Sequence, residues 1–89
     1  MRLARHYLVS GRVQGVGFRF FAYGAATREH VHGWARNRLD GTVEMLAEGS
    51  EESMRRFERA IRQGPPSAQV TGFAVTPVAD EGHTGFSIR

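Results

Sequence analysis

The sequence predicts an α+β fold in which two helices cover one face of an antiparallel sheet. Three observations support this prediction. Stretches with the alternation typical of strands surround two stretches with helical periodicity. The order along the chain is β-α-β-β-α-β, followed by a short last strand. With 89 residues the chain has room for one hydrophobic core, so we expect a single domain over residues 1–89.

The first third of the chain predicts a strand, a glycine-rich loop and a helix. Residues 3–10, LARHYLVS, alternate and are rich in aromatic and branched side chains, as strands are. The loop GRVQGVGFR follows at 11–19. Apolar residues then recur at helical spacing and predict a helix from Phe18 to about His30. These residues are Phe18, Phe21, Ala22 and Ala25. We interpret Gly24 as a point of close packing.

A pair of strands joined by a tight turn is predicted next. Residues 31–38 and 42–48 read as strands, and LDG at 39–41 has the Asp-Gly chemistry of a turn. Turn geometry therefore explains Asp40 better than a catalytic role does. Alternation divides the first of these strands into two faces. One face holds Gly33, Ala35 and Asn37, and the other holds Trp34, Arg36 and Arg38.

The second helix has clear start and stop signals. Ser50 can cap its first turn, two glutamates follow near the positive end of the helix dipole, and Gly64-Pro65-Pro66 ends it. Its predicted buried stripe is Met54, Phe57 and Ile61. Its arginines follow acids at i,i+4 spacing, which predicts a solvated, self-paired face. The pairs are Glu51–Arg55, Glu52–Arg56 and Glu58–Arg62.

Residues 69–78 and 83–88 complete the pattern as two further strands. The resulting order of elements is that of a ferredoxin-like α/β sandwich, in which two helices cover one face of an antiparallel sheet. This fold supports many unrelated functions, so it does not select one.

Composition and charge narrow the class of protein. The chain is 40% hydrophobic and 24% charged, as folded globular domains are. The absence of cysteine excludes disulfides and thiolate chemistry, and favours the cytoplasm. No apolar run approaches the ~18 residues of a membrane span, and no signal peptide is evident. We expect a monomer. The net charge of +3 suits an anionic ligand, either a phosphorylated small molecule or nucleic acid.

The loop at 11–19 has the residues of an anion site. It joins the end of a strand to the start of a helix, where backbone N–H groups are unpaired and the helix dipole is positive. Gly11, Gly15 and Gly17 allow the backbone to curl so that these groups converge. Arg19 adds a guanidinium fork suited to phosphate oxygens. The loop therefore predicts a phosphate or carboxylate ligand. A glycine-rich turn without any ligand is the alternative.

Other polar residues give weaker signals. Asn37 offers a neutral donor and acceptor, which suits holding a water, although a simple role at a strand end would also explain it. His30 and His32 would share a face of a strand, but two ligands make a poor zinc site, so we predict no metal. His6 and His83 are interpreted as isolated surface or sheet residues.

Two segments together resemble the two signature motifs of the acylphosphatase family. They are VSGRVQGVGFR at 9–19 and GWARNRLDGTVEMLAEG at 33–49. The order of elements and the segment GFSIR at 85–89 also fit, so the resemblance covers nearly the whole chain. It implies hydrolysis of acyl phosphates, the mixed anhydrides of carboxylic and phosphoric acid, to a carboxylate and inorganic phosphate without a cofactor.

The resemblance also implies roles for individual residues. Arg19 corresponds to the arginine that binds the substrate phosphate, and Asn37 to the asparagine that orients the attacking water. The main chain at Arg89 is implied to bring its carboxylate near Arg19. The backbone N–H groups of one stretch correspond to the cradle around the phosphate. That stretch is Gln14, Gly15, Val16, Gly17, Phe18 and Arg19.

The chemistry of the reaction is compatible with these residues. A carboxylate leaves easily, and phosphoryl transfer depends mainly on positioning and electrostatics. An arginine and N–H groups can supply the positive charge, and neither motif has a carboxylate cluster to hold a metal. We therefore predict direct in-line attack by water, with a phosphate oxygen of the substrate accepting the proton.

Two alternatives remain open. One is a nucleic-acid-binding domain on the same fold, although strand 42–48 lacks the exposed aromatics of RNA-binding sheets. Three acids in or beside that strand, Asp40, Glu44 and Glu48, also disfavour it. The other is a phosphate-binding module without turnover, which the presence of both Arg19 and Asn37 disfavours.

Overall fold

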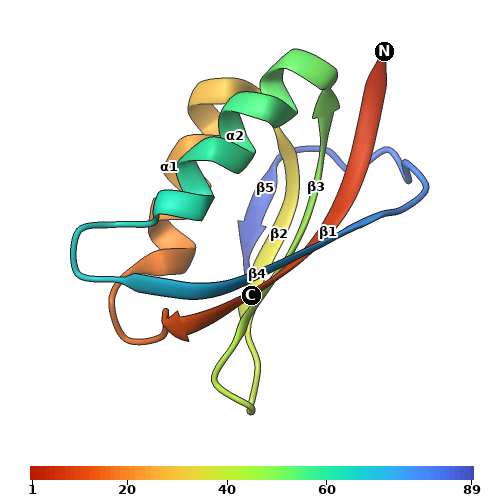
Figure 1. Ribbon diagram of the computed structural model, residues 1–89. Coiled ribbons are helices and arrows are strands. Elements are labelled where there is room, and N and C mark those ends of the chain that lie inside the picture. The colour runs from red at the N-terminus through yellow and green to blue at the C-terminus, as the bar shows by residue number, and fades with distance from the viewer.

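Five strands form one sheet, and two helices pack on one of its faces in the computed structural model, which describes residues 1–89 (Figure 1). The strand order is β4-β1-β3-β2-β5. The predicted ferredoxin-like order of two helices and five strands is therefore confirmed. The elements are β1 (Arg2–Arg12), α1 (Phe18–Glu29), β2 (His32–Asn37), β3 (Val43–Ser50), α2 (Glu51–Gln63), β4 (Gln69–Pro77) and β5 (Phe86–Ile88).

The sheet is mixed, because the short C-terminal strand that was predicted beside the antiparallel sheet joins it in parallel. Strands β4, β1, β3 and β2 pair antiparallel, and His6 of β1 lies opposite Thr76 of β4. Strand β5 instead pairs parallel with β2, with Gly33 opposite Phe86. The reason is the connection at residues 78–85, which runs from one edge of the sheet to the other and so enters β5 in the direction of β2.

Two expectations about α1 also need correction. Gly24 is exposed, and a Cβ added there would meet no atom within 4 Å, so it is not a point of close packing. His30 has φ 58° and ψ 41° and ends α1 in the left-handed conformation. It lies outside β2, which begins at His32, so these two histidines do not share a face of a strand.

The core lies between the helices and the sheet. The predicted stripe of α2 is confirmed, since Met54, Phe57 and Ile61 are fully buried. Tyr7 of β1 packs between Phe57 and Phe73, with ring centroids 6.2 and 5.6 Å away. The rest of the buried cluster comes mainly from α1, β2 and β3, and consists of Val9, Val13, Phe18, Ala22, Ala25, Ala26, Val31, Ala35, Val43, Met45 and Ala47.

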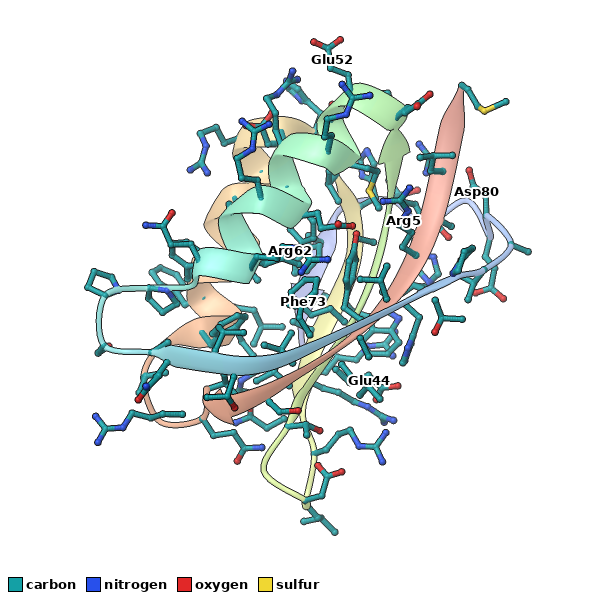
Figure 2. All side chains as sticks on the ribbon, in the orientation of Figure 1. Arg5, Glu44, Glu52, Arg62, Phe73 and Asp80 are labelled. Atoms are coloured by element: carbon teal, nitrogen blue, oxygen red, sulfur yellow. The ribbon has the colours of Figure 1, made fainter.

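A charged layer borders this core beside α2. Tyr7 donates its hydroxyl hydrogen to Oε1 of Glu58 at 3.2 Å, and Arg5 donates to the same oxygen at 3.0 Å. Burial, and then the Glu58 carboxylate, raise the pKa of Tyr7. Arg62 lies over the ring of Phe73, with Cζ 4.3 Å from the centroid (Figure 2). The layer closes the gap between α2 and the β1–β4 half of the sheet.

The charged side chains on the exposed face of α2 form i,i+4 ion pairs with one another, as predicted. Arg55, Arg56 and Arg62 lie 3.7, 3.0 and 3.6 Å from the acids four residues before them. Arg56 also donates to Glu29 of α1 at 2.6 Å and so links the two helices. Each exposed i,i+4 pair contributes about 0.3–0.5 kcal/mol, so the arginines mainly neutralise their own acids.

We expect Ser50→Ala to lower the free energy of unfolding by about 1 kcal/mol. The Ser50 hydroxyl accepts a hydrogen bond from the Ser53 N–H at 3.1 Å, and alanine leaves that N–H unpaired. Urea denaturation of both proteins measures the difference. Ser87→Ala is a matched control, because Ser87 is exposed on β5 and its hydroxyl makes no hydrogen bond within the protein. Equal effects of the two substitutions would contradict the capping role.

Candidate active site

A pocket of about 140 Å³ opens where the glycine-rich loop, the start of α1 and the end of β2 meet. Its lining residues are Val13, Gly15, Gly17, Phe18, Arg19, Phe20 and Asn37. Arg19 and Asn37 supply the only polar side chains among them. The fold thus brings together two residues that are 18 positions apart in the sequence.

The loop presents unpaired backbone N–H groups at this pocket. Gly15 and Gly17 have φ of 73° and 75°, and Gly17 caps α1 in the left-handed conformation, with no side chain capping the helix. The first hydrogen bond of the helix runs from the Phe21 N–H to the Gly17 carbonyl at 2.9 Å. No N–H from Gln14 to Phe20 donates to another protein group. The first turn also lacks acidic residues, so this end of α1 is positive.

Gly11 does not belong to this loop, which corrects the role expected for it. It lies within β1, where the register with β4 shifts. A Cβ on Gly11 would lie 2.2 Å from the Gln69 carbonyl oxygen, and its φ is 115°. The glycine is therefore required by the close approach of two strands.

The side chains of Gln14 and Val16 point away from the pocket. Gln14 donates through Nε2 to the carbonyl oxygens of Arg38 at 2.7 Å and Thr42 at 2.9 Å, and so ties the loop to the turn between β2 and β3. Val16 packs against the core, and its carbonyl oxygen accepts a hydrogen bond from the Ser67 hydroxyl at 3.3 Å. Only the main chain of these two residues is available to a ligand. Sequence reasoning missed the role of the Gln14 amide.

Arg19 is oriented by Arg89, the residue that follows β5. Its Nη1 donates to the main-chain oxygen of Arg89 at 2.7 Å. The Arg89 N–H in turn donates to the carbonyl oxygen of Ala35 at 2.8 Å, two residues before Asn37 in β2. The pairing of β5 with β2 therefore fixes the position of the Arg19 guanidinium relative to the Asn37 side chain. The implied proximity of Arg89 and Arg19 is present in the structure.

Asn37 is the last residue of β2 and has a free side chain. It is exposed, and its amide makes no hydrogen bond within the protein. It belongs to the face of β2 that carries the buried Gly33 and Ala35, which is the face toward the helices. A donor and an acceptor are thus both available at the pocket.

The turn after Asn37 is held by its own residues. Asp40 accepts hydrogen bonds from the hydroxyl and the N–H of Thr42, at 2.6 and 3.0 Å. These bonds, the hydroxyl first, lower the pKa of the Asp40 carboxyl. The Arg38 guanidinium lies 3.5 Å from the same carboxylate. Asp40 does not line the pocket, in agreement with the structural role expected for it.

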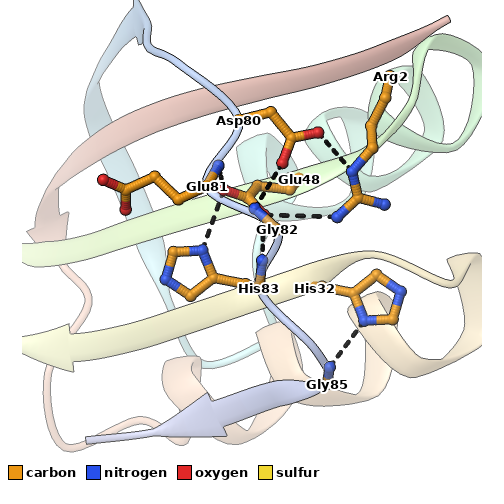
Figure 3. Close-up of polar contacts among 8 residues, drawn as sticks. All are labelled: Arg2, His32, Glu48, Asp80, Glu81, Gly82, His83 and Gly85. Carbon is orange, nitrogen blue, oxygen red and sulfur yellow. Dashed lines mark hydrogen bonds and ion pairs between the residues drawn. The ribbon is translucent and has the colours of Figure 1, made fainter.

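The opposite face of the sheet contains a buried carboxylate that the sequence analysis did not identify (Figure 3). Glu48 of β3 is fully buried beneath the connection at 78–85. It accepts hydrogen bonds from the N–H groups of Glu81 at 2.8 Å and His83 at 2.7 Å. The His83 ring and Arg2 lie 3.0 and 3.4 Å away. Burial by itself raises the pKa of Glu48, but these hydrogen bonds outweigh it and lower the pKa to about 2.

A second carboxylate on this face pairs with a histidine in the same way. Nε2 of His6 lies 2.7 Å from Oε2 of Glu44, and Arg36 donates to the other carboxylate oxygen. Burial raises the pKa of Glu44, and the bonds from His6 and Arg36 lower it overall. The interpretation of His6 and His83 as isolated residues is therefore wrong, since each contacts a buried glutamate. For His6 and Glu44, alternation along β1 and β3 was the available signal, because it puts both side chains on the same face. His83 lies in the connection at 78–85, outside any strand, so alternation could not indicate its contact.

The structure assembles no group of three or more His, Cys, Asp or Glu side chains that could hold a metal ion. Neither helix is both long enough and apolar enough to cross a bilayer.

Two solved structures with this architecture and clear sequence similarity belong to one class of small α+β hydrolases. The crystal structure of acylphosphatase from Bacillus subtilis superposes with a TM-score of 0.95 at 45% identity, covering 98% of each chain. An acylphosphatase from Coxiella burnetii superposes with a TM-score of 0.94 at 32% identity, covering 99% of this chain and 93% of the other.

Sequence comparisons give the same result. The acylphosphatase family model matches residues 5–88. The acylphosphatase of Bacillus velezensis is 52% identical over 73 residues, which cover 82% of this chain and 81% of the relative. The chain belongs to the acylphosphatase family, and its resemblance to the two signature motifs is confirmed at the level of the family.

Proposed function

We propose that this chain hydrolyses acyl phosphates by in-line attack of a water held by Asn37 on a phosphoryl group held by Arg19. The backbone N–H groups of residues 14–19 complete the cradle around the phosphate. The observation that carries this proposal is the convergence of the Arg19 guanidinium, the unpaired N–H groups and the free Asn37 amide on one pocket. Family membership supports the reaction class.

Binding of the phosphate rests on charge and preorganisation. A guanidinium has five N–H donors, and the hydrogen bond to Arg89 uses Nη1, which leaves the others for phosphate oxygens. Val13 and Phe18 are buried beneath the pocket, and an apolar floor strengthens the interaction between opposite charges. These groups supply positive charge where the transition state of phosphoryl transfer concentrates negative charge.

Activation of the water needs no enzymatic base. The pocket lining contains no carboxylate, histidine or cysteine, the side chains that serve as bases near neutral pH. Asn37 positions the water, and a phosphate oxygen of the substrate accepts its proton. The leaving carboxylate is stable as an anion, so a general acid is also unnecessary. Positioning and electrostatics then provide the acceleration.

The test is hydrolysis of benzoyl phosphate in the presence of EDTA. We expect turnover without added metal, competitive inhibition by inorganic phosphate, and a kcat that stays nearly constant between about pH 5 and 8 because no group of the enzyme must titrate. Phenyl phosphate is the matched control substrate, since its poorer leaving group requires an acid, and we expect it to be hydrolysed far more slowly. A strict requirement for a metal, or equal rates on both substrates, would contradict the mechanism.

We also infer that the chain acts as a monomer in the cytoplasm on a small-molecule substrate. The glycine-rich loop, α1 and β2 of one chain supply the N–H groups, Arg19 and Asn37 that the proposed reaction uses. The absence of cysteine is typical of a protein that does not depend on an oxidising compartment. Light scattering that gives the mass of a dimer at assay concentrations would contradict the monomer.

A further inference from the structure

We propose that Phe20 and Tyr23 form an aromatic ledge at the mouth of the pocket, which binds the acyl group and favours substrates with flat, apolar acyl groups. This inference rests on the proposed function and adds a substrate preference to it.

The ledge is exposed and ordered by stacking. Phe20 is 72% exposed and Tyr23 is 41% exposed, although both belong to α1. Their rings are nearly parallel, with an angle of 8° between the planes and 6.3 Å between centroids. Residues three apart in a helix lie on the same side, so the two rings form one continuous surface. Phe20 itself lines the pocket, and the ledge therefore begins where the phosphate cradle ends.

The other apolar side chains of the pocket cannot receive the acyl group. Val13 and Phe18 are 1% and 2% exposed and form the floor under the cradle. The pocket of about 140 Å³ must also hold the phosphoryl group and the attacking water. A bulky acyl group must therefore lie outside, at the mouth, where Phe20 is the only exposed apolar side chain of the lining.

The in-line geometry of the reaction also places the acyl group beside Phe20. The attacking water and the leaving carboxylate must lie on opposite sides of the phosphorus atom. Asn37, which holds the water, comes from β2, whereas Arg19 and Phe20 come from the first turn of α1. A water on the side of β2 leaves the acyl group on the side of α1, next to Phe20.

The neighbouring surface is less suited to an apolar group. A shallow groove beyond Asn37 is lined by Arg36, Arg38, Leu39 and Asp40, which are mostly charged and already paired. Aromatic rings attract each other in offset-stacked or edge-to-face geometry. A benzoyl group can therefore make favourable ring contacts with the ledge, whereas an acetyl group is too small to reach it. Leu39 is fully exposed in that groove and offers the matched control.

The test compares benzoyl phosphate with acetyl phosphate for the wild type, Phe20→Ala, Tyr23→Ala and Leu39→Ala. We expect Phe20→Ala to raise the KM for benzoyl phosphate about ten-fold, with a much smaller change for acetyl phosphate. The kcat should change little, because the ledge binds substrate and transition state alike. Tyr23→Ala should have a smaller effect in the same direction, and Phe20→Trp should restore the preference. Equal losses on both substrates, or a larger loss in Leu39→Ala, would overturn the proposal.

A second measurement separates failure of the ledge from failure of the proposed function. Phenylphosphonate and methylphosphonate share the phosphonate group but differ in the apolar group, and neither is hydrolysed. We expect phenylphosphonate to bind more tightly to the wild type and to lose that advantage in Phe20→Ala. If the wild type hydrolyses neither acyl phosphate, the proposed function is wrong and the ledge loses its substrate. If both are hydrolysed and Phe20→Ala leaves the preference unchanged, only the ledge is wrong.

Discussion

Replacing Arg19 with glutamine is expected to lower kcat/KM for benzoyl phosphate by about a thousand-fold or more. Glutamine removes the only positive charge among the side chains that line the pocket. It leaves the backbone cradle in place, because the loop is held by Gln14 and by the glycines rather than by the guanidinium. The loss should therefore appear in a protein that remains folded, as judged by circular dichroism and by its urea midpoint.

The matched control is Arg12→Gln, which removes the same charge from an exposed residue at the end of β1 that makes no ion pair. We expect its kinetics to stay close to those of the wild type. Asn37→Ala isolates the other half of the mechanism. Its kcat should fall about a hundred-fold, while inhibition by inorganic phosphate stays nearly unchanged because Arg19 and the cradle are intact. Weaker phosphate binding in Asn37→Ala, or normal turnover in Arg19→Gln, would contradict the assigned roles.

Replacing Glu48 with glutamine is expected to lower the free energy of unfolding by about 3 kcal/mol at pH 7. The side chain is fully buried, and its two oxygens accept from two backbone N–H groups and face the His83 ring. A glutamine has nearly the same shape but turns an NH₂ group toward at least one of these donors. Without the carboxylate, the connection at 78–85 loses hydrogen bonds that attach it to the sheet. Urea denaturation measures the effect.

The contribution of Glu48 should also depend on pH in a defined window. Its pKa is about 2 in the folded protein and 4.5 in the unfolded reference. The folded pKa is the lower one, so the stabilisation is complete above about pH 4.5 and is lost as the pH falls toward about 2. The free energy of unfolding of Glu48→Gln should therefore fall less steeply than that of the wild type in this window. Glu81→Gln is the control, because its exposed side chain makes no ion pair. Equal slopes for wild type and Glu48→Gln would contradict the assignment.

Local signals explain which elements could be predicted from the sequence. Helix α2 begins after Ser50 and ends at Gly64, where a capping serine and a glycine indicated its limits. The glycine-rich loop and Arg19 could be proposed as an anion site because the residues that suggest it lie within one short segment. Asn37 was identified mainly through the resemblance to a known family, since its own position at the end of a strand is ambiguous.

Contacts between distant segments explain what could not be predicted. The parallel pairing of β5 depends on how the connection at 78–85 crosses the sheet. The residue types in that connection do not indicate its path. The burial of Glu48 depends on the same crossing. The role of Gly11 depends on how closely β4 approaches β1. In each case the partner lies more than thirty residues away, beyond the reach of periodicity and capping rules.

The position of β1 in the sheet has a consequence for how the chain folds. This strand lies between β3 and β4, and its partner in β4 is separated from it by two helices and two strands. During synthesis β1 can pair with β3 early, but its other edge stays open until β4 has left the ribosome. An open edge is a template for pairing with another chain. Closing such long loops slows folding, so the nascent chain exposes this edge for longer than a fold built from neighbouring hairpins would.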